Sequence, residues 1–251
     1  MGVGRAAIAA AVLAAVASTL RPGGAAVLVR GATIRPGARI TRPDIEPFRN
    51  RLPYKFYRCT ITFIFRDSLR RLYTGTTAEK DCVPRVGARV YDENGRSFGT
   101  AVFKEFQAPS MSFTLIRIDR SRYRDVNPSV QGWGGPTGVA TPAMVKPRNV
   151  ILFTGNGFGE GDLPRTRPRA GILVSYDPKS FTADSLAELG DSGGPVVDAA
   201  TGRAVGMISK FALFRRPPTT DIGPTIQRIL ADLARHRFRL RLVTAPFTPP
   251  F

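Results

Sequence analysis

Histidine and cysteine are scarce in this chain of 251 residues, which contains one histidine, His236, and two cysteines, Cys59 and Cys82. A structural zinc site normally needs four such ligands, so a Cys/His zinc cluster is implausible and we expect no metal site. Acidic residues are also few: 19 aspartates and glutamates face 37 lysines and arginines, leaving a formal net charge of +18. The remaining composition, with 43% hydrophobic and 22% charged residues, is ordinary for a globular protein and excludes a disordered chain.

The surplus of positive charge predicts salt-dependent attraction to anionic partners, such as an anionic cell-wall polymer or membrane surface. The basic residues are spread along the chain and no nucleic-acid-binding motif accompanies them, so no specific nucleic acid is expected. A solvated basic surface without a dedicated partner is the simpler alternative.

Long apolar segments are missing after the N-terminus. Residues 6–17 are apolar but too short to span a bilayer comfortably, and they follow Arg5 and end in the small-residue pattern Ala15-Val16-Ala17. This pattern is typical of a secretory signal peptide, which we place at residues 1–26; an uncleaved anchor is the alternative. The protein is therefore expected to be secreted, and in an exported chain Cys59 and Cys82 most simply form one disulfide.

Short strands separated by turn residues dominate the chain that follows. Alternating β-branched and aromatic residues predict strands at 59–65 and 112–118. Asn94-Gly95 predicts a tight hairpin turn between strands at 89–91 and 97–103. Beyond a Gly- and Pro-rich stretch, further strands are predicted at 150–153, 171–176, 195–198 and 204–209.

One helix is predicted near the C-terminus. Pro224 suits a first helical turn, and apolar residues then recur at the spacing of one helical face: Ile226, Ile229, Leu230 and Leu233. Residues 237–243 return to alternation, which predicts a half-exposed strand with an arginine face. Many short strands with one helix favour an all-β barrel or sandwich.

The segment Gly190-Asp191-Ser192-Gly193-Gly194-Pro195 carries the clearest chemical signal in the sequence. A serine hydroxyl attacks well only when a base takes its proton and donors stabilise the oxyanion. Glycines beside the serine permit the backbone angles that turn successive N–H groups toward one pocket. A glycine-rich turn between strands is the simpler interpretation of these residues.

All six residues resemble the nucleophile loop of chymotrypsin-like (trypsin-like) serine peptidases. The resemblance extends over about residues 55–245. Residues 205–209 are similar to the family's substrate-flanking strand. Cys59 and Cys82 are placed like the disulfide that brackets the family's catalytic histidine. The tail at 241–244 resembles that of actinobacterial secreted members. The resemblance implies an all-β fold of two six-stranded antiparallel β-barrels with a C-terminal helix, and a monomer is expected.

The implied organisation divides the chain into consecutive units. They are a signal peptide (1–26), an N-terminal arm or pro-like segment (27–54), a first barrel (55–126), an interlobe linker (127–141), a second barrel (142–222), and a C-terminal helix and tail (223–251).

The resemblance also implies roles for single residues. Ser192 would be the nucleophile, the N–H groups of Gly190 and Ser192 the oxyanion hole, and Asp191 a buried carboxylate that locks the loop through an unidentified cation. Leu186 would lie at the base of the specificity pocket, with Ser209 on its flanking strand, which makes the pocket apolar. Asp184 is close enough in sequence that a small register change would alter this inference.

Two triad positions depart from the family pattern. The family places Thr-Ala-x-His before the second cysteine, whereas this chain reads Thr77-Ala78-Glu79-Lys80-Asp81-Cys82, with one inserted residue and no histidine. Lys80 or Asp81 therefore replaces the base, depending on the alignment. Ser112 stands where the orienting aspartate belongs. We therefore expect a pseudopeptidase that binds a peptide or protein in the cleft between the barrels.

Two residues are alternatives for the missing base. His236 ends the predicted helix, where its expected role is contact with the last helical carbonyls. Lys80 could form a serine–lysine dyad, so an active serine endopeptidase acting through a Ser192 acyl-enzyme is the alternative function. The run Gly155 to Gly161 is glycine-rich like a dinucleotide loop, but prolines follow it instead of a helix, and no cofactor is expected.

Overall fold

The computed structural model describes residues 33–42, 59–107, 111–157, 169–185, 187, 190–212 and 220–249. The predicted signal peptide at 1–26 and the predicted pocket residue Leu186 lie outside the described residues. Within the described ranges, no helix has the length and apolar character needed to cross a membrane.

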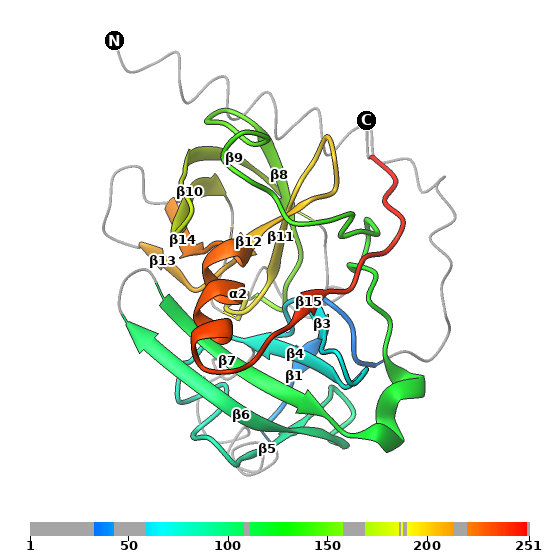
Figure 1. The fold of residues 1–251 in the computed structure, drawn as a ribbon. Helices are drawn as coiled ribbons and strands as arrows, with labels where there is room; N and C mark the ends of the chain where they lie inside the picture. Colours follow the sequence, from blue (N-terminus) through cyan, green and yellow to red (C-terminus); the bar gives the residue numbers. More distant parts are fainter. Residues whose placement is uncertain are drawn as a thin grey trace.

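A six-stranded antiparallel sheet forms the first lobe, with the strand order β15-β3-β4-β7-β6-β5 (Figure 1). Its strands are β3 (Ile64–Arg66), β4 (Leu72–Thr76), β5 (Arg89–Tyr91), β6 (Ser97–Gln107), β7 (Met111–Ile118) and β15 (Arg241–Leu242). A short ladder of β1 (Arg39–Ile40) with β2 (Cys59–Thr60) precedes β3 along the chain. Gly95 lies in the turn between β5 and β6 with φ of 70°, as the predicted Asn94-Gly95 hairpin requires.

A second antiparallel sheet forms the other lobe, with the strand order β12-β11-β8-β9-β10-β14-β13. Its strands are β8 (Val150–Phe153), β9 (Arg169–Tyr176), β10 (Ser180–Ser185), β11 (Pro195–Asp198), β12 (Ala204–Met207), β13 (Lys210–Ala212) and β14 (Thr220–Pro224). Gly206, on the edge strand β12, bridges to Thr225, which follows β14. Two antiparallel sheets with a C-terminal helix confirm the predicted all-β class, and the short β13 adds a strand at the edge of the second sheet.

Three apolar clusters hold these sheets together. On β7, Phe113 and Leu115 enter a central cluster, whereas Ile116 and Ile118 enter the core of the first lobe, as the alternation predicts. The central cluster also contains residues of the second sheet, such as Leu152 and Val197 below 1% exposure, and the buried face of the helix. It therefore joins both lobes and the helix into one body.

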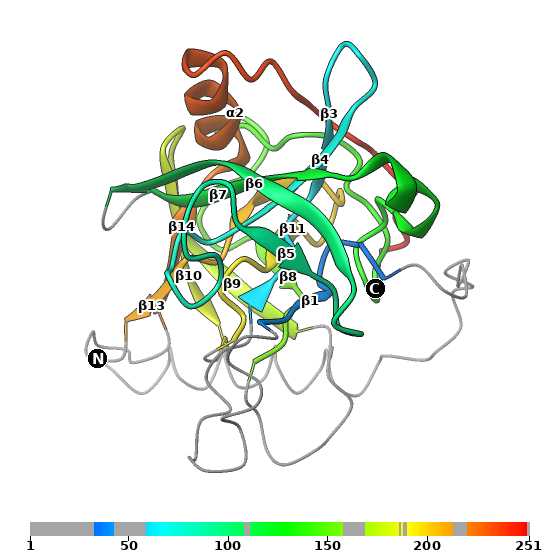
Figure 2. The same ribbon diagram turned by 90° about the horizontal axis from the view of Figure 1, so that it is seen from below.

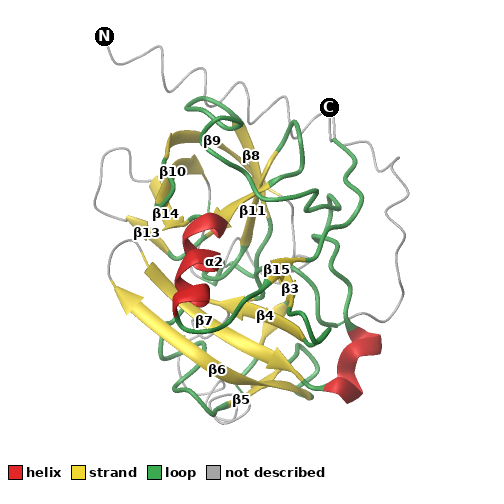
Figure 3. Cartoon of the chain, viewed as in Figure 1, coloured by secondary structure: helices red, strands yellow, loops and turns green. Residues whose placement is uncertain are grey.

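Helix α2 (Ile226–Arg235) packs over the junction of the two sheets (Figure 3). Thr225 caps its N-terminus, because the Thr225 hydroxyl accepts a hydrogen bond from Arg228 N at 3.1 Å. Ile226, Ile229 and Leu233 are fully buried, which confirms the predicted apolar face. The chain then leaves the helix and returns along β3 as β15.

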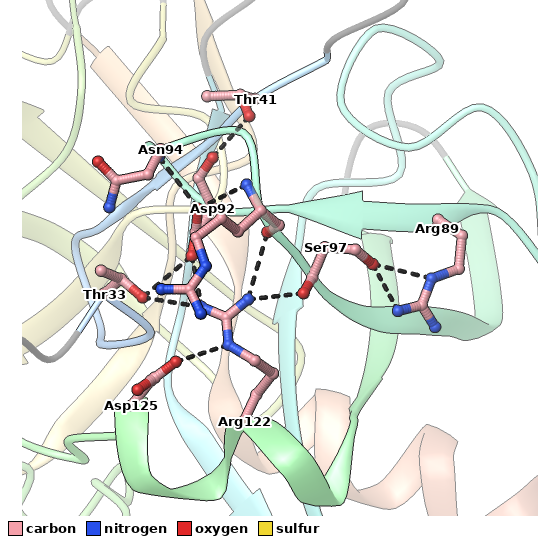
Figure 4. A network of polar contacts seen from close by, with 9 residues as sticks. Thr33, Thr41, Arg89, Asp92, Asn94, Ser97, Arg122 and Asp125 are labelled. Atoms are coloured by element: carbon pink, nitrogen blue, oxygen red, sulfur yellow. Dashed lines mark hydrogen bonds and ion pairs between the residues drawn. The ribbon is translucent and has the colours of Figure 1, made fainter.

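The described part of the N-terminal arm, residues 33–42, packs into the first lobe. Ile34 and Ile40 are buried in its core, and β1 pairs with β2. An ion-pair network fixes this segment (Figure 4): Arg122 Nη2 lies 2.5 Å from Asp92 Oδ2 and 3.2 Å from the hydroxyl of Thr33. Asp125 accepts a further bond from Arg122 Nε at 2.6 Å. The network ties the arm to the β5–β6 hairpin and to the 3-10 helix η2 (Arg120–Asp125).

The linker between the lobes is held by the C-terminal tail. Gly135 N donates to the carbonyl of Pro246 at 2.6 Å, and Ala245 N donates to the carbonyl of Pro136 at 2.9 Å. The tail therefore contributes to the relative placement of the two sheets.

The predicted disulfide is present. Cys59 on β2 and Cys82 are joined across 5.5 Å between their Cα atoms, and both residues are buried in the core of the first lobe. A formed disulfide fits an oxidising, extracellular compartment.

Candidate active site around Ser192

Ser192 lies on a tight loop between β10 and β11 that depends on two glycines in the left-handed region. Gly190 has φ of 106°, and a Cβ there would stand 2.6 Å from the carbonyl oxygen of Asn156. Gly193 has φ of 96°, and a Cβ there would collide with the carbonyl of Thr60 and the hydroxyl of Thr76. A side chain at either position would add backbone strain and a steric clash, so the loop shape requires glycine at both.

Backbone hydrogen bonds anchor this loop to both lobes. Gly193 N donates to the carbonyl of Ile208 at 2.7 Å, and Ile208 N donates to the carbonyl of Gly194 at 2.9 Å. On the other side, Thr60 N donates to the carbonyl of Ser192 at 2.9 Å. Ser192 is therefore held at the junction between β2 of the first lobe and the residues that follow β12 of the second.

A buried ion pair fixes Asp191, the predicted loop-locking carboxylate. Asp191 is 0% exposed, and its Oδ1 lies 2.5 Å from Nη2 of Arg169 and accepts a bond from Gly157 N at 2.8 Å. The Arg169 guanidinium also lies over the ring of Phe153, 5.0 Å from its centroid. Arg169, on β9, is the cation that the sequence did not identify, because no local pattern relates a strand residue to a loop residue 22 positions away.

Thr60 forms a second clamp that sequence reasoning missed. Its hydroxyl donates to the carbonyl of Gly190 at 2.9 Å and accepts a bond from Asn156 N at 3.1 Å. The Asn156 side chain reaches both the Thr60 hydroxyl at 3.2 Å and the carbonyl of Gly37 at 3.0 Å. These buried bonds connect the loop, through Thr60 and Asn156, to the N-terminal arm; the bond between Asn156 and Gly37 alone spans 119 residues of sequence.

The predicted oxyanion donors have no acceptor among the residues that the structure describes. Neither Gly190 N nor Ser192 N donates a hydrogen bond to another described residue, and no described group bonds to the Ser192 hydroxyl. Ser192 is half-buried. No described group therefore competes with an external ligand for the serine hydroxyl or for these two N–H groups.

Ser112 lies beside the segment that carries the base in the family pattern. It is 5% exposed on β7, and its hydroxyl lies 2.7 Å from the hydroxyl of Thr77 and accepts a bond from Ala78 N at 3.0 Å. The backbone there is therefore bound by a neutral hydroxyl where the family places a carboxylate. A hydroxyl satisfies the Ala78 N–H but supplies no negative charge to orient or stabilise an imidazolium.

Lys80 and Asp81, the two candidates for the base position, are exposed on the turn before Cys82. Neither makes a hydrogen bond or ion pair with Ser192 in the described part of the chain. The backbone carbonyl of Lys80 accepts a bond from Arg42 Nη1 at 3.1 Å. Lysine acts as a general base when burial removes its charge, and an exposed side chain does not meet that condition.

Charged side chains of both signs surround this turn, where Glu79 and Asp81 flank Lys80. Lys104 Nζ donates to the carbonyl of Val83 at 2.6 Å, just after Cys82. Burial, followed by repulsion from Lys80 and Arg42, lowers the pKa of Lys104 below its ordinary value. Lys80, Lys104 and Arg42 therefore lie near one another at this turn, together with the exposed carboxylates of Glu79 and Asp81.

His236 is occupied at the end of α2, as predicted. Its Nδ1 lies 2.9 Å from the carbonyl of Asp232, and its ring packs on Phe103 with 4.8 Å between centroids. Because the chain has one histidine, no imidazole is hydrogen-bonded to Ser192.

The remaining predicted site residues are placed only in part. Ser209 is 3% exposed and follows β12, next to Ile208, which bonds the nucleophile loop. Asp184 lies on β10, and the described ranges stop short of Leu186, so the apolar specificity pocket stays a prediction. No group of three or more His, Cys, Asp or Glu side chains within the described ranges is placed to hold a metal ion.

Comparison of folds places the chain among known architectures. It is similar to Thermobifida fusca protease A, with 21% identity, a TM-score of 0.56, and coverage of 84% of this chain and 98% of the other. It is similar to a Cellulomonas bogoriensis chymotrypsin, with 18% identity, a TM-score of 0.53 and coverage of 84% and 98%. A serine protease described as specific for glutamic acid has 13% identity, a TM-score of 0.56 and coverage of 84% and 100%.

No protein-family model matches the chain, and no curated protein sequence matches it. At identities below 25%, these similarities establish the chymotrypsin-like serine-protease fold and leave the activity to be argued from the site itself.

Proposed function

We propose that this chain is an exported, chymotrypsin-fold pseudopeptidase that binds a peptide or protein between its two lobes without cleaving it. The observation that carries the proposal is the contact of the Ser112 hydroxyl with Ala78 N at 3.0 Å, in the absence of any imidazole bonded to Ser192. The chain keeps the N–H groups of Gly190 and Ser192 as oxyanion donors, but it lacks the base and the orienting carboxylate that would move the proton of the Ser192 hydroxyl.

Cleavage through Ser192 needs a group that takes the hydroxyl proton and returns it to the leaving amine. Ser112 is neutral, and Lys80 and Asp81 are exposed and make no bond to Ser192. Loss of any triad member leaves only the residual catalysis that binding and the oxyanion hole supply. The site is therefore expected to be slower than an intact triad by about three to six orders of magnitude.

The groups that the nucleophile loop retains are suited to binding a ligand more than to cleaving it. Gly190 N and Ser192 N have no acceptor within the described part of the chain, so a ligand carbonyl placed over them would satisfy both. The cations Lys80 and Lys104 at the first-lobe side favour a ligand with acidic side chains there. The Arg169–Asp191 pair and the Thr60 clamp keep the loop in shape without any contribution from catalysis.

Labelling with a fluorophosphonate probe tests the absence of chemistry. The full-length protein is expected to label no faster than its Ser192→Ala variant. Rapid labelling that requires Ser192 would overturn the pseudopeptidase proposal. If labelling also disappeared in Lys80→Ala but persisted in His236→Ala, the active endopeptidase with a lysine base would replace it.

Binding is tested with a library of fluorescent peptides of graded net charge. Acidic peptides are expected to bind more tightly, and Lys80→Ala should weaken them while Arg85→Ala, an exposed arginine three residues beyond Cys82, should not. Equal affinity for acidic and basic peptides would contradict the assignment of the site to acidic ligands.

A further inference from the structure

The β3–β4 hairpin extends beyond the body of the first sheet and carries an exposed leucine at its tip (Figure 2). Leu69 is 66% exposed, the highest value among the exposed large hydrophobic residues described. Arg66 and Arg70 flank it and are exposed. An apolar tip between two arginines is not stabilised by packing within the chain.

Two arginines stand directly opposite one another at the base of this hairpin. In the antiparallel pairing of β15 with β3, Arg241 is the register partner of Arg66, so the two side chains leave the same face of the sheet. Both are exposed, and neither forms an ion pair within the described part of the chain. Like charges in directly opposed positions destabilise a sheet, and an anion between them would relieve the repulsion.

The nearby charges do not neutralise this pair. Asp67, the acidic residue of the hairpin, is bound by Arg71 Nε at 2.6 Å and by the hydroxyl of Tyr73. Arg239 is exposed two residues before Arg241, although the strand predicted at 237–243 forms only at 241–242. The arginine hairpin surface is defined here by Arg66, Leu69, Arg70, Arg239 and Arg241.

We propose that the arginine hairpin surface binds the face of an anionic phospholipid membrane. Arginines attract phosphate headgroups, and Leu69 is placed at the tip where it would enter the interfacial layer. A soluble polyanion would use the four arginines but would gain nothing from an exposed leucine. The leucine is therefore the feature that favours a lipid surface over an anionic wall polymer.

This surface lies apart from the candidate active site. Strand β4 runs from Leu72, near the hairpin, to Thr76, whose hydroxyl faces Gly193 in the nucleophile loop. At about 3.3 Å per residue, these two ends of β4 are about 13 Å apart, and the tip of the hairpin is farther still. A membrane-bound molecule could therefore keep the Ser192 site open to a ligand, and the membrane proposal stands independently of the proposed function.

Co-sedimentation with lipid vesicles tests the proposal. The probe is a vesicle of phosphatidylcholine with about one third phosphatidylglycerol, compared with phosphatidylcholine alone, at about 0.1 M and about 0.5 M NaCl. The variants are Arg66→Gln/Arg241→Gln, Leu69→Ser, and the charge-matched control Arg85→Gln/Lys146→Gln, whose residues are exposed outside the hairpin and tail. Dextran sulfate serves as the soluble polyanion.

Binding to the anionic vesicles is expected to fall about 30-fold in Arg66→Gln/Arg241→Gln, because each arginine near an anionic surface contributes about fivefold. The control should lose less than about threefold, and Leu69→Ser should weaken vesicle binding but not dextran sulfate binding. Thermal stability of Arg66→Gln/Arg241→Gln should equal or exceed that of the parent, which separates lost binding from lost folding.

If both double variants lost vesicle binding equally, the proposal would be overturned, because the net charge of the protein and not the arginine hairpin surface would then cause the binding. Unchanged vesicle binding in Leu69→Ser, with parallel losses on dextran sulfate and vesicles, would assign the surface to an anionic polymer instead. Ser192→Ala should not change vesicle binding, so the outcome is distinguishable from a failure of the pseudopeptidase proposal.

Discussion

Replacing Arg169 by methionine should destabilise the protein far more than replacing an exposed arginine. Asp191 is 0% exposed, and Arg169 is the cation paired with it at 2.5 Å. Arg169→Met keeps most of the side-chain length but removes the cation that is paired with a buried carboxylate, which costs about 3–5 kcal/mol. For a chain of this size, that loss lowers the melting temperature by about 6–20 °C.

Arg89→Met is the matched control. Arg89 also pairs with an aspartate, Asp119, but the two side chains are 43% and 34% exposed, so solvent screens the interaction. The expected loss is below about 1 kcal/mol. Urea unfolding followed by tryptophan fluorescence and circular dichroism measures both variants, with unchanged m-values indicating that the unfolded state is comparable.

The double variant Arg169→Met/Asp191→Asn separates the ion pair from simple packing. Removing the charge from residue 191 as well should restore part of the stability, because no buried charge is then left unpaired. If Arg169→Met lost no more than Arg89→Met, or if the double variant were as unstable as the sum of the two single variants, the lock would not be the buried charge pair.

Three further outcomes follow from the described contacts. Burial alone would raise the pKa of Asp92, but hydrogen bonds, led by that from Arg122, hold this pKa below its ordinary value of 3.8. The ionised Asp92 therefore contributes to folding stability above about pH 4, and this contribution is lost as the pH falls through the folded-state pKa. In Asp92→Asn, the free energy of unfolding should depend less steeply on pH in this acid range. Reducing the Cys59–Cys82 disulfide, which closes 23 residues of chain, should cost about 3 kcal/mol in a denaturant titration. Gly193→Ala should destabilise the protein by at least about 2 kcal/mol more than Gly95→Ala, because both have positive φ but an added Cβ meets atoms only at Gly193; equal losses would show that the clash is relieved.

The sequence predicts best the short strands that lie between turn residues, both the buried β8 and β11 and the partly exposed β5, which spans the predicted residues 89–91. Strands β8 and β11 begin and end where apolar runs bounded by turn residues predict them, and β7 begins one residue earlier than predicted. The segment predicted as one strand at 59–65 is instead split into β2 and β3. Ile61 N donates to the carbonyl of Ala38 and Thr62 N to that of Gly75, so the chain changes partner between these two residues. Alternation alone does not record a change of partner.

Strand β4 was not predicted because its stability comes from contacts made at a distance. It reads Leu-Tyr-Thr-Gly-Thr, and Thr74 is fully buried with its hydroxyl bonded to the carbonyl of Phe63 at 2.9 Å. Gly75 is required because the ring of Phe113 occupies the space of a Cβ. A threonine-rich segment predicts a buried strand only when the groups that accept hydrogen bonds from the threonine hydroxyls are known.

The residues of the site also fall into two groups: those that the sequence motif predicts, and those that only the folded structure brings next to it. The loop residues 190–195 were identified from their order in the chain, and the disulfide from the cysteine count and the expected export. Arg169, Thr60 and Asn156 were not, because Arg169 and Thr60 reach the loop across 22 and 130 residues, and Asn156 reaches Thr60 across 96, which leaves no local pattern.

The contacts of the loop explain why its motif indicates a fold more strongly than an activity. Gly190 and Gly193 are required by positive φ and close neighbours, and Asp191 is required by its buried pairing with Arg169. These constraints act whether or not the protein cleaves anything. Lys80 and Asp81 carry no comparable packing role, because both are exposed.

Ser192 is the exception within the motif. Its backbone carbonyl accepts a bond from Thr60 N, which any residue could supply, whereas its hydroxyl bonds to no other described residue. Packing within the described structure therefore does not require a serine there, unlike the neighbouring glycines and Asp191. A ligand that forms a hydrogen bond with this hydroxyl would give a reason for a serine at position 192. Replacing Ser192 by alanine should thus leave folding stability unchanged within about 0.5 kcal/mol and alter only ligand binding.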